Sequence, residues 1–308
     1  MPSLSPNLEV NIGGVAMKNP VATASGTCGY GDAYTDFYHP NLLGALVTKG
    51  ISLEPRLGNS TPRIAETPAG MLNAIGLENV GLKVFLNEKL PPLRDSDVTV
   101  IVNIFGNTED EYVHLAETIS AAVGVHGLEA NISCPNVKAG GIEFGTDPQV
   151  AGKLVAKIKA VAGRPLWVKL SPNVTDIAAI AQAVEQAGAD AISAINTLKG
   201  MAIDLDKREP ILANVTGGLS GPAIKPIALR MVHEIARAVK IPVVGIGGIV
   251  TARDALEFLT SGASAVQIGT ASFLDPRAPI QIINGIKSYL REHNIQNVQE
   301  IIGTLKRH

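Results

Sequence analysis

Short runs of apolar residues recur along the chain and alternate with longer stretches in which apolar and polar positions follow a helical period. Each run ends in or near Gly, Ser, Thr, Asn or Pro, which is typical of short buried strands that lead into loops. The runs cover residues 20–27, 45–50, 98–106, 127–134, 165–171, 191–196, 241–248 and 265–270. The pattern therefore predicts eight strands.

Most of the segments between these runs predict helices, and several carry recognisable caps. The expected helices are 108–123 with Thr108 as N-cap, one opened by Asp147-Pro148, 175–187 capped by Thr175, 252–260 between Thr251 and Gly262, and one from Asp275-Pro276 to about residue 292. Strands that alternate with helices indicate a parallel β/α arrangement. Eight strands close a barrel, whereas open doubly wound sheets more often have five or six. The predicted fold class is α/β, a (β/α)8 TIM barrel.

Three stretches depart from the simple repeat. Residues 8–18, with Gly13-Gly14 in the middle, predict an N-terminal β-hairpin that covers the bottom of the barrel. Residues 51–77 form a long connection after the second strand, and residues 198–221 form a polar insertion after strand six. No linker or change of composition divides the chain, so residues 1–308 are expected to form a single domain.

Composition narrows the class of protein. Hydrophobic residues make up 46% of the chain but aromatic residues only 4%, so the core is built from Ala, Val, Ile and Leu, as in parallel strands buried on both faces. The 26 basic and 28 acidic residues form no long tract, which argues against nucleic acid as a partner. Two cysteines are too few for a disulfide scaffold or a four-cysteine metal site, and no metal site is expected. With no apolar leader and no membrane-length apolar stretch, a cytoplasmic location is expected.

Polar groups gather where the fourth predicted strand ends, in Asn131-Ile-Ser-Cys-Pro-Asn136. The carboxyl ends of barrel strands are where such folds carry their chemistry. None of the six histidines falls at a predicted strand end, which disfavours a His–Cys dyad and a Ser/His/Asp triad. By elimination, Cys134 is the candidate for proton transfer.

Glycine-rich turns follow the last two strands, at Gly245-Ile-Gly-Gly248 and Gly269-Thr270, and a third lies at residues 217–222. Exposed backbone N–H groups at such turns bind phosphate, and a Cβ would hold the phosphate away. Tight packing is the alternative explanation for any single turn. Together they favour a ligand that carries a phosphate.

Lysines and asparagines near the predicted strand ends indicate that the ligand also carries polar or charged groups. Lys169 lies within an apolar strand and Lys49 at the end of another, where an ammonium is unfavourable unless it meets an anion or polar ligand. The alternative, a side chain that reaches out to solvent from a strand end, applies better to Lys49 than to Lys169. Four asparagines near strand ends or loops suggest a planar ligand with amide edges, namely Asn73, Asn103, Asn131 and Asn196.

These residues resemble a known family, the class 1 dihydroorotate dehydrogenases, and within it class 1B. The resemblance rests on Asn131-Ile-Ser-Cys-Pro-Asn-Val-Lys-Ala-Gly-Gly141, residues 144–148, Asn73-Ala-Ile-Gly-Leu77, Gly218-Leu-Ser-Gly-Pro-Ala-Ile-Lys-Pro226 and Gly245-Ile-Gly-Gly248. It spans nearly the whole chain. Class 2 enzymes carry serine in place of the cysteine, and class 1A enzymes lack the Lys-Ala-Gly-Gly sequence that follows the cysteine.

The resemblance implies one FMN per chain in the mouth of the barrel. The FMN phosphate would lie on Gly221, Gly247, Gly248, Gly269 and Thr270. The ring would contact Ser25, Lys49, Gly50, Asn103, Asn131, Lys169 and Ile195. The substrate would be held by Lys49, Asn73, Ala74, Ile75, Gly76, Leu77, Asn131, Asn196 and Thr197.

The implied reaction is the oxidation of (S)-dihydroorotate to orotate in pyrimidine biosynthesis. Cys134 would remove a proton from C5 while a hydride leaves C6 for flavin N5, and residues 138–141 would form a lid. Because thiolate is the active form of the base, activity is expected to rise with pH. The resemblance also implies a homodimer that associates, as a heterotetramer, with a subunit carrying FAD and [2Fe-2S], and this subunit passes electrons to NAD. This chain has neither four cysteines nor a Gly-x-Gly-x-x-Gly fingerprint after a strand.

Three other functions remain open at this point. The chain is also compatible with a class 1A-like flavoenzyme that uses fumarate and works alone. A non-redox phosphate-binding barrel, an aldolase or synthase with Lys169 as Schiff-base amine, belongs to a different class. A silent binding subunit is disfavoured because Cys134 and the glycine turns are intact.

Overall fold

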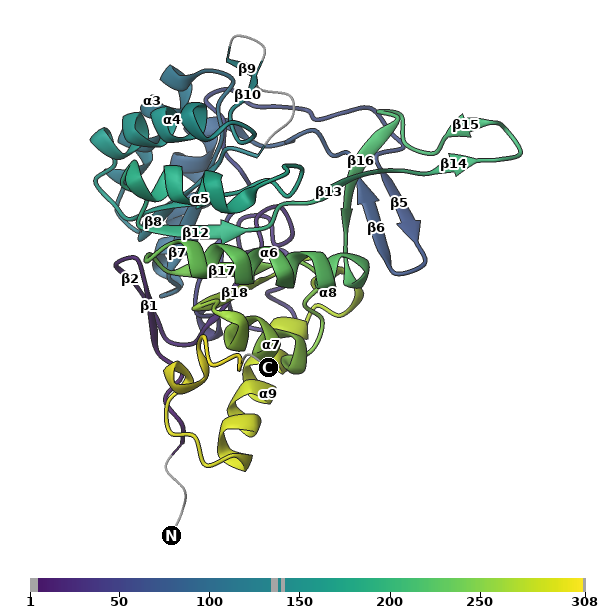
Figure 1. The fold of residues 1–308 in the computed structure, drawn as a ribbon. Helices are drawn as coiled ribbons and strands as arrows, with labels where there is room; N and C mark the ends of the chain where they lie inside the picture. Colours follow the sequence, from purple (N-terminus) through teal and green to yellow (C-terminus); the bar gives the residue numbers. More distant parts are fainter. Residues whose placement is uncertain (1–4, 134–137, 140–141, 307–308) are drawn as a thin grey trace.

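A ring of eight short parallel strands forms the centre of the protein (Figure 1). The computed structural model describes residues 5–133, 138–139 and 142–306. Around the ring the strands are β3 (Val21–Thr23), β18 (Ala265–Ile268), β17 (Val243–Ile246), β12 (Ala191–Ala194), β11 (Leu166–Lys169), β8 (Gly127–Asn131), β7 (Val100–Ile104) and β4 (Leu46–Val47). A parallel bridge between Ala22 and Ala45 joins the two ends of this sheet. The predicted α/β barrel is confirmed.

Every residue of these eight strands is buried, since helices pack outside the ring and side chains fill its interior. The surrounding helices are α3 (Glu109–Ser120), α4 (Pro148–Val161), α5 (Ile177–Gln186), α6 (Lys225–Ala238), α7 (Ala252–Ser261) and α9 (Ala278–Glu292). Their buried residues recur at helical spacing, as Ala151, Leu154, Val155 and Ile158 do in α4. Shorter elements are α1 (Gly81–Val84), η2 (Phe85–Lys89), α2 (Leu90–Asp95), α8 (Ala271–Leu274), η1 (Pro40–Leu42), η3 (Pro222–Ile224) and η4 (Val298–Ile301).

The helix caps test the predicted boundaries. Thr108, Asp147 and Thr251 are N-caps as expected, and Thr251 forms a capping box with Asp254. The cap of α5 is Asp176, one residue later than predicted. The prediction that Asp275-Pro276 opens the last helix is wrong. Asp275 is the C-cap of the short helix α8 and α9 begins at Ala278, because an extra helical turn follows the eighth strand.

The N-terminal segment forms the expected hairpin from β1 (Val10–Ile12) and β2 (Val15–Met17). It lies against the amino ends of the barrel strands, where the indole Nε1 of Trp167 donates a hydrogen bond of 3.1 Å to the Ile12 carbonyl. Gly13 has φ +58°, and a Cβ there would lie 2.3 Å from the Asp190 carbonyl oxygen. The turn therefore requires glycine in order to approach the barrel this closely.

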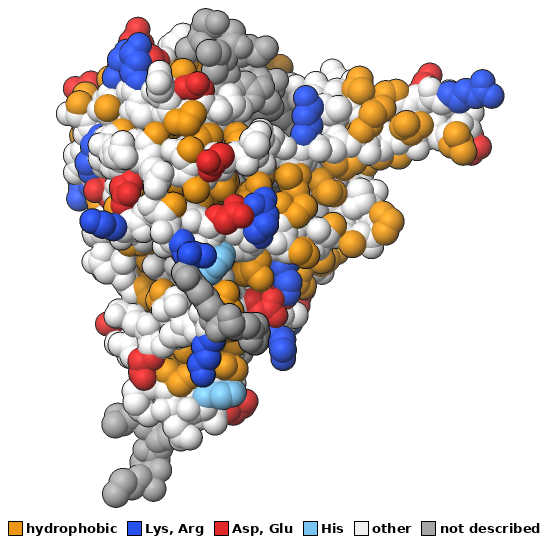
Figure 2. Space-filling view, in the orientation of Figure 1, with side chains coloured by type: hydrophobic (Ala, Val, Ile, Leu, Met, Phe, Trp, Pro, Cys, Tyr) orange, Lys and Arg blue, Asp and Glu red, His pale blue; other side chains and the backbone are white. Residues whose placement is uncertain are grey.

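The two long insertions meet in a second, antiparallel sheet. This sheet contains β13 (Leu198–Met201), β16 (Thr216–Ser220), β6 (Gly70–Asn73) and β5 (Ile64–Thr67), in that order. The hairpin of β14 (Ile203–Asp204) and β15 (Glu209–Pro210) extends it into an arm that projects from the barrel (Figure 1). Figure 2 shows hydrophobic side chains gathered along this arm, where Met201, Ile203 and Leu205 are exposed.

Two further strands, β9 (Lys138–Ala139) and β10 (Ile142–Glu143), pair with each other in antiparallel fashion.

Across the described ranges, no helix combines the length and the apolar character needed to cross a bilayer.

Cys28, Tyr34 and Tyr38 form a largely buried cluster that follows β3. Burial raises the pKa of the Cys28 thiol from 9.0 to about 11, with a smaller contribution from Asp32. Burial likewise raises the pKa values of Tyr34 and Tyr38. The native state therefore keeps protons that the unfolded chain releases above pH 9.

We expect the free energy of unfolding to fall as pH rises from 9 to 11, by ~1–2 kcal/mol for Cys28 alone. Urea unfolding of wild type and Cys28→Ala across this range measures the effect, because the variant lacks the contribution of the thiol. An identical pH dependence in the two proteins would contradict the assignment to Cys28.

Candidate active site

A cavity of about 890 Å³ opens at the carboxyl ends of the barrel strands and extends beneath the second sheet. All residues that the sequence assigns to flavin or substrate line it. They are Ser25, Lys49, Gly50, Asn73, Ala74, Ile75, Gly76, Leu77, Asn103, Asn131, Lys169, Ile195, Asn196, Thr197, Gly221, Gly247, Gly248, Gly269 and Thr270. The fold thus brings these residues together, although their individual roles remain predictions.

The predicted base Cys134 lies outside the described residues, as do Gly140 and Gly141 of the predicted lid. The residue before Cys134, Ser133, is described and lines the cavity. Its hydroxyl donates to Asn131 Oδ1 at 2.5 Å and accepts from Asn196 Nδ2 at 2.5 Å. This chain of hydrogen bonds joins the carboxyl end of β8 to that of β12 and fixes two of the predicted ligand-binding carboxamides.

Three backbone turns converge on one side of the cavity. Gly221, Gly247 and Gly248 have φ values of +96°, +128° and +72°. A Cβ on Gly248 would lie 2.8 Å from the Lys225 nitrogen and 2.9 Å from the Gly221 carbonyl oxygen, so two of the turns are in contact. Thr270 Oγ1 donates a hydrogen bond of 2.8 Å to the Ser220 hydroxyl, and this bond joins the third turn, at Gly269-Thr270, to the turn at Gly221. Such a cluster of glycine turns before helices is typical of a phosphate site.

Lys225 stabilises these turns without offering a free charge. Its ammonium pairs with Asp254 at 2.6 Å and Glu257 at 2.8 Å, which links the first turn of α6 to α7. The hydrogen bond to Asp254, followed by that to Glu257, raises the pKa of Lys225. Asp254 also accepts from the backbone nitrogens of Val250 and Thr251, just after the Gly247-Gly248 turn.

Lys49 and Lys169, which line the cavity, have no counter-ion among the described residues. Lys169 is only 6% exposed at the end of β11, and Lys49 is half-buried after β4. Within the described ranges neither ammonium has a carboxylate within 4.0 Å. Because a buried ammonium needs an anion or polar acceptor, the cavity favours a ligand with negative charge.

Two carboxamides in the lining also have an unsatisfied atom. The oxygens Asn103 Oδ1 and Gln267 Oε1 are buried and have no hydrogen-bond partner in the described part of the chain. Buried acceptors of this kind are rare in native proteins unless a ligand or water supplies a donor. The glycine turns can hold a phosphate and the lysines can stabilise an electron-rich ring, so the residues present fit FMN.

Sequence reasoning missed several residues that line the cavity, including Arg63, Asn173, Lys199 and Phe273. Arg63 and Lys199 belong to the two insertions, which only the second sheet brings together, so local sequence carries no signal for them. Gln267 was detectable, since a polar residue interrupts the apolar run 265–268. The same signal marks Glu129 in the run 127–131.

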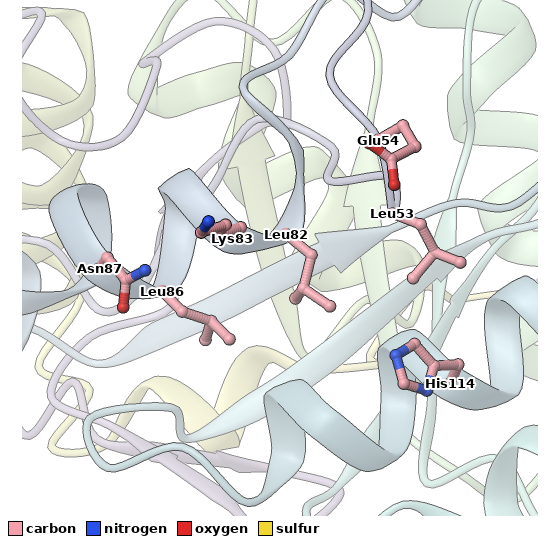
Figure 3. A pocket seen from close by; sticks show the side chains of 7 residues that line it. All are labelled: Leu53, Glu54, Leu82, Lys83, Leu86, Asn87 and His114. Carbon is pink, nitrogen blue, oxygen red and sulfur yellow. The ribbon is translucent and has the colours of Figure 1, made fainter.

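The described histidines have structural surroundings away from this cavity. His126 Nδ1 accepts from the Val100 nitrogen at 3.0 Å, and burial, with a smaller effect of Arg164, lowers the pKa of His126. His233 Nδ1 lies 3.0 Å from the Ser261 carbonyl oxygen. His114 lines a separate, mainly apolar hollow of about 330 Å³ with Leu53, Leu82 and Leu86 (Figure 3). None of the residues assigned to flavin or substrate lines that hollow.

A closed parallel barrel with a polar cavity and glycine turns at its carboxyl end defines a class, the phosphate-binding α/β-barrel enzymes. Comparison with known proteins identifies the family, because the model described as "Dihydroorotate dehydrogenase" matches residues 7–290. The chain belongs to the dihydroorotate dehydrogenase family.

Relatives across the whole length refine this result. The chain is 58% identical over 301 residues to the "Dihydroorotate dehydrogenase B (NAD(+)), catalytic subunit" of Geotalea daltonii, an alignment that covers 98% of this chain and 99% of that protein. Proteins of the same name match in Geotalea uraniireducens, with 59% identity over 97% of this chain and 98% of the relative, and in Geobacter sulfurreducens, with 58% identity over 98% and 99%. These matches confirm the resemblance to class 1B.

Proposed function

We propose that this protein oxidises dihydroorotate to orotate, a step of pyrimidine biosynthesis, as the FMN-binding catalytic subunit of an NAD-linked dihydroorotate dehydrogenase. The observation that carries the proposal is the convergence of the described family motifs on one cavity. The cavity offers what such a substrate needs, since Asn73 and Asn196 have carboxamides for a cyclic ureide and Lys49 has a cation for its carboxylate.

FMN, when bound, supplies the hydride acceptor. In the proposed site the turns at Gly221, Gly247-Gly248 and Gly269-Thr270 hold its phosphate, and Lys169 and Asn103 contact its ring. Lys169 has no carboxylate partner within the described residues, so its charge is available to stabilise negative charge on the ring. Ser133 Oγ donates to Asn131 Oδ1 and accepts from Asn196 Nδ2, and these two hydrogen bonds keep both carboxamides oriented toward the substrate.

Cys134 is proposed as the base that removes the proton from C5 of dihydroorotate as the hydride leaves C6. Proton and hydride loss together form the C5–C6 double bond, so the atoms and electrons balance. Among the described residues that line the cavity there is no histidine, and the only carboxylate is Glu78, which pairs with Arg63. These surroundings support the thiol as base.

A partner subunit is proposed as the next electron acceptor. The relatives are named catalytic subunits of an NAD(+) enzyme, which supports a second subunit that carries FAD and [2Fe-2S] and delivers electrons to NAD. The two cysteines of this chain are fewer than the four that a [2Fe-2S] cluster takes in most proteins. The exposed apolar side chains of the arm, Met201, Ile203 and Leu205, support a homodimer within the heterotetramer.

An anaerobic absorbance spectrum of the purified protein, before and after addition of dihydroorotate, tests this function. We expect a flavin band that bleaches with substrate and returns when an oxidant is added. A band that dihydroorotate does not bleach would reject the substrate. Absence of a flavin band after reconstitution with FMN would reject the flavoenzyme and favour the non-redox barrel.

A further inference from the structure

Among the described residues, one carboxylate is buried inside the barrel, beneath the cavity. Glu129, in the middle of β8, has no exposed surface. Its Oε1 accepts from Asn103 Nδ2 at 2.7 Å and its Oε2 accepts from Gln267 Nε2 at 2.6 Å. Asn103 is on the neighbouring strand β7, but Gln267 is on β18, which does not adjoin β8 in the ring. Glu129 therefore connects two sides of the barrel through its interior.

The chemistry of a carboxylate dictates how these two amides are turned. An ionised carboxylate has only acceptors, so Asn103 and Gln267 must present their NH2 groups to Glu129. Their carbonyl oxygens are then directed elsewhere, and both are among the buried side-chain oxygens that lack a hydrogen-bond partner in the described ranges. Both residues line the cavity. Glu129 thus sets which way the two amides at the base of the cavity are turned.

The charge of Glu129 is also uncompensated by a direct ion pair. No lysine, arginine or histidine nitrogen of the described residues lies within 4.0 Å of its carboxylate. Two buried amide donors stabilise it, which explains how a charge is tolerated without exposure. In an interior of low dielectric constant such a charge acts over several ångströms.

We propose that Glu129 is a positioning residue of the flavin site, which orients Asn103 and Gln267 and whose negative charge lowers the reduction potential of the bound flavin. The inference rests on the proposed function, since it requires FMN in the cavity. Lys49 and Lys169 favour negative charge on the reduced ring, and Glu129 opposes it from beneath. The balance keeps the flavin reducing enough to pass its electrons on toward NAD.

The test measures the midpoint potential of FMN bound to wild type and to Glu129→Gln, which keeps the shape but removes the charge. We expect the variant to bind reduced relative to oxidised flavin about tenfold more tightly, a rise of ~30 mV for the two-electron couple. Glu129→Asp keeps the charge and is expected to stay closer to wild type. Ser193→Ala is the matched control, because it removes from β12 a buried hydroxyl that has no partner among the described residues, without a change of charge.

Each outcome separates the possibilities. An unchanged potential in Glu129→Gln, or an equal rise in Ser193→Ala, would overturn the inference. Glu129→Met, which also removes the charge at similar volume, replaces Glu129→Gln if that variant does not fold. Failure of both charge-removing variants to fold, while Ser193→Ala folds, would make Glu129 a folding residue and overturn the inference as well.

The result is independent of the substrate. If wild type binds FMN but is not bleached by dihydroorotate, the proposed reaction is rejected. The change in midpoint potential between wild type and Glu129→Gln still tests the role of Glu129. Wild type that bleaches normally, with no shift in the variants, would reject Glu129 alone. A protein that binds no FMN would reject both.

Discussion

Cys134→Ser is expected to keep its flavin and its fold but to reduce that flavin with dihydroorotate ~10²–10⁴-fold more slowly than wild type at pH 7, the range that general-base catalysis commonly contributes. A serine hydroxyl has far too high a pKa to accept a proton unless a second base assists it. No histidine lines the described cavity, so none of the described histidines can provide this assistance. Rapid-mixing measurement of flavin bleaching under anaerobic conditions gives the rate directly.

The pH dependence and a matched control strengthen this experiment. With an ordinary thiol pKa of about 8.5, the wild-type rate is expected to rise with pH through neutrality and then level off, and Cys134→Ser should lack this rise. Cys28→Ala is the control, since that thiol is buried, is absent from the cavity and has its pKa raised by burial to about 11. A Cys134→Ser protein that bleaches at the wild-type rate would exclude Cys134 as the base.

The barrel was predictable because its determinants are local. A parallel strand that is buried on both faces must be apolar throughout, and helix starts such as Thr108 and Thr251 have side chains that bond the first free N–H groups. Polar residues that interrupt or end such runs, like Asn131 and Lys169, then have few places to point other than the barrel mouth. Fold and cavity therefore follow from the same pattern.

The second sheet was not predictable, because it depends on pairing between distant segments. Asn73 is in register with Gly218, and the residues between them include most of the barrel. Gly217 and Gly218 were interpreted as part of a phosphate turn, yet they lie within β16. A Cβ on Gly218 would lie 2.0 Å from Thr197 Oγ1, so glycine allows the strand to pass over the end of β12. Only Gly221 of that motif has the turn conformation, with φ +96°.

Glu129 illustrates a different limit. Its position in an apolar run marks it as unusual, but its partner Gln267 is 138 residues away in sequence. Only closure of the ring places the two side chains opposite each other. The sequence thus shows a charged residue within an apolar run, whereas the hydrogen bonds that stabilise the buried charge can be seen only in the folded structure.

Gly248→Ala is expected to weaken FMN binding by roughly 100-fold, which is about 2.7 kcal/mol. The residue has φ +72°, where a side chain is strained. The new Cβ would also lie 2.8 Å from the Lys225 nitrogen and 2.9 Å from the Gly221 carbonyl oxygen. Both neighbours are backbone atoms, so the clash can be relieved only by separating the two turns that are proposed to hold the phosphate.

Titration of flavin-free protein with FMN, followed by quenching of flavin fluorescence, measures this loss. Gly163→Ala is the matched control, because the nearest atom to its Cβ, Ser120 Oγ, is 3.6 Å away and its φ lies outside the left-handed region. Riboflavin separates the phosphate from the ring, since it should bind wild type and Gly248→Ala with nearly equal affinity. If Gly248→Ala retains its fold by circular dichroism and still binds FMN as tightly as wild type, the phosphate does not lie on these turns.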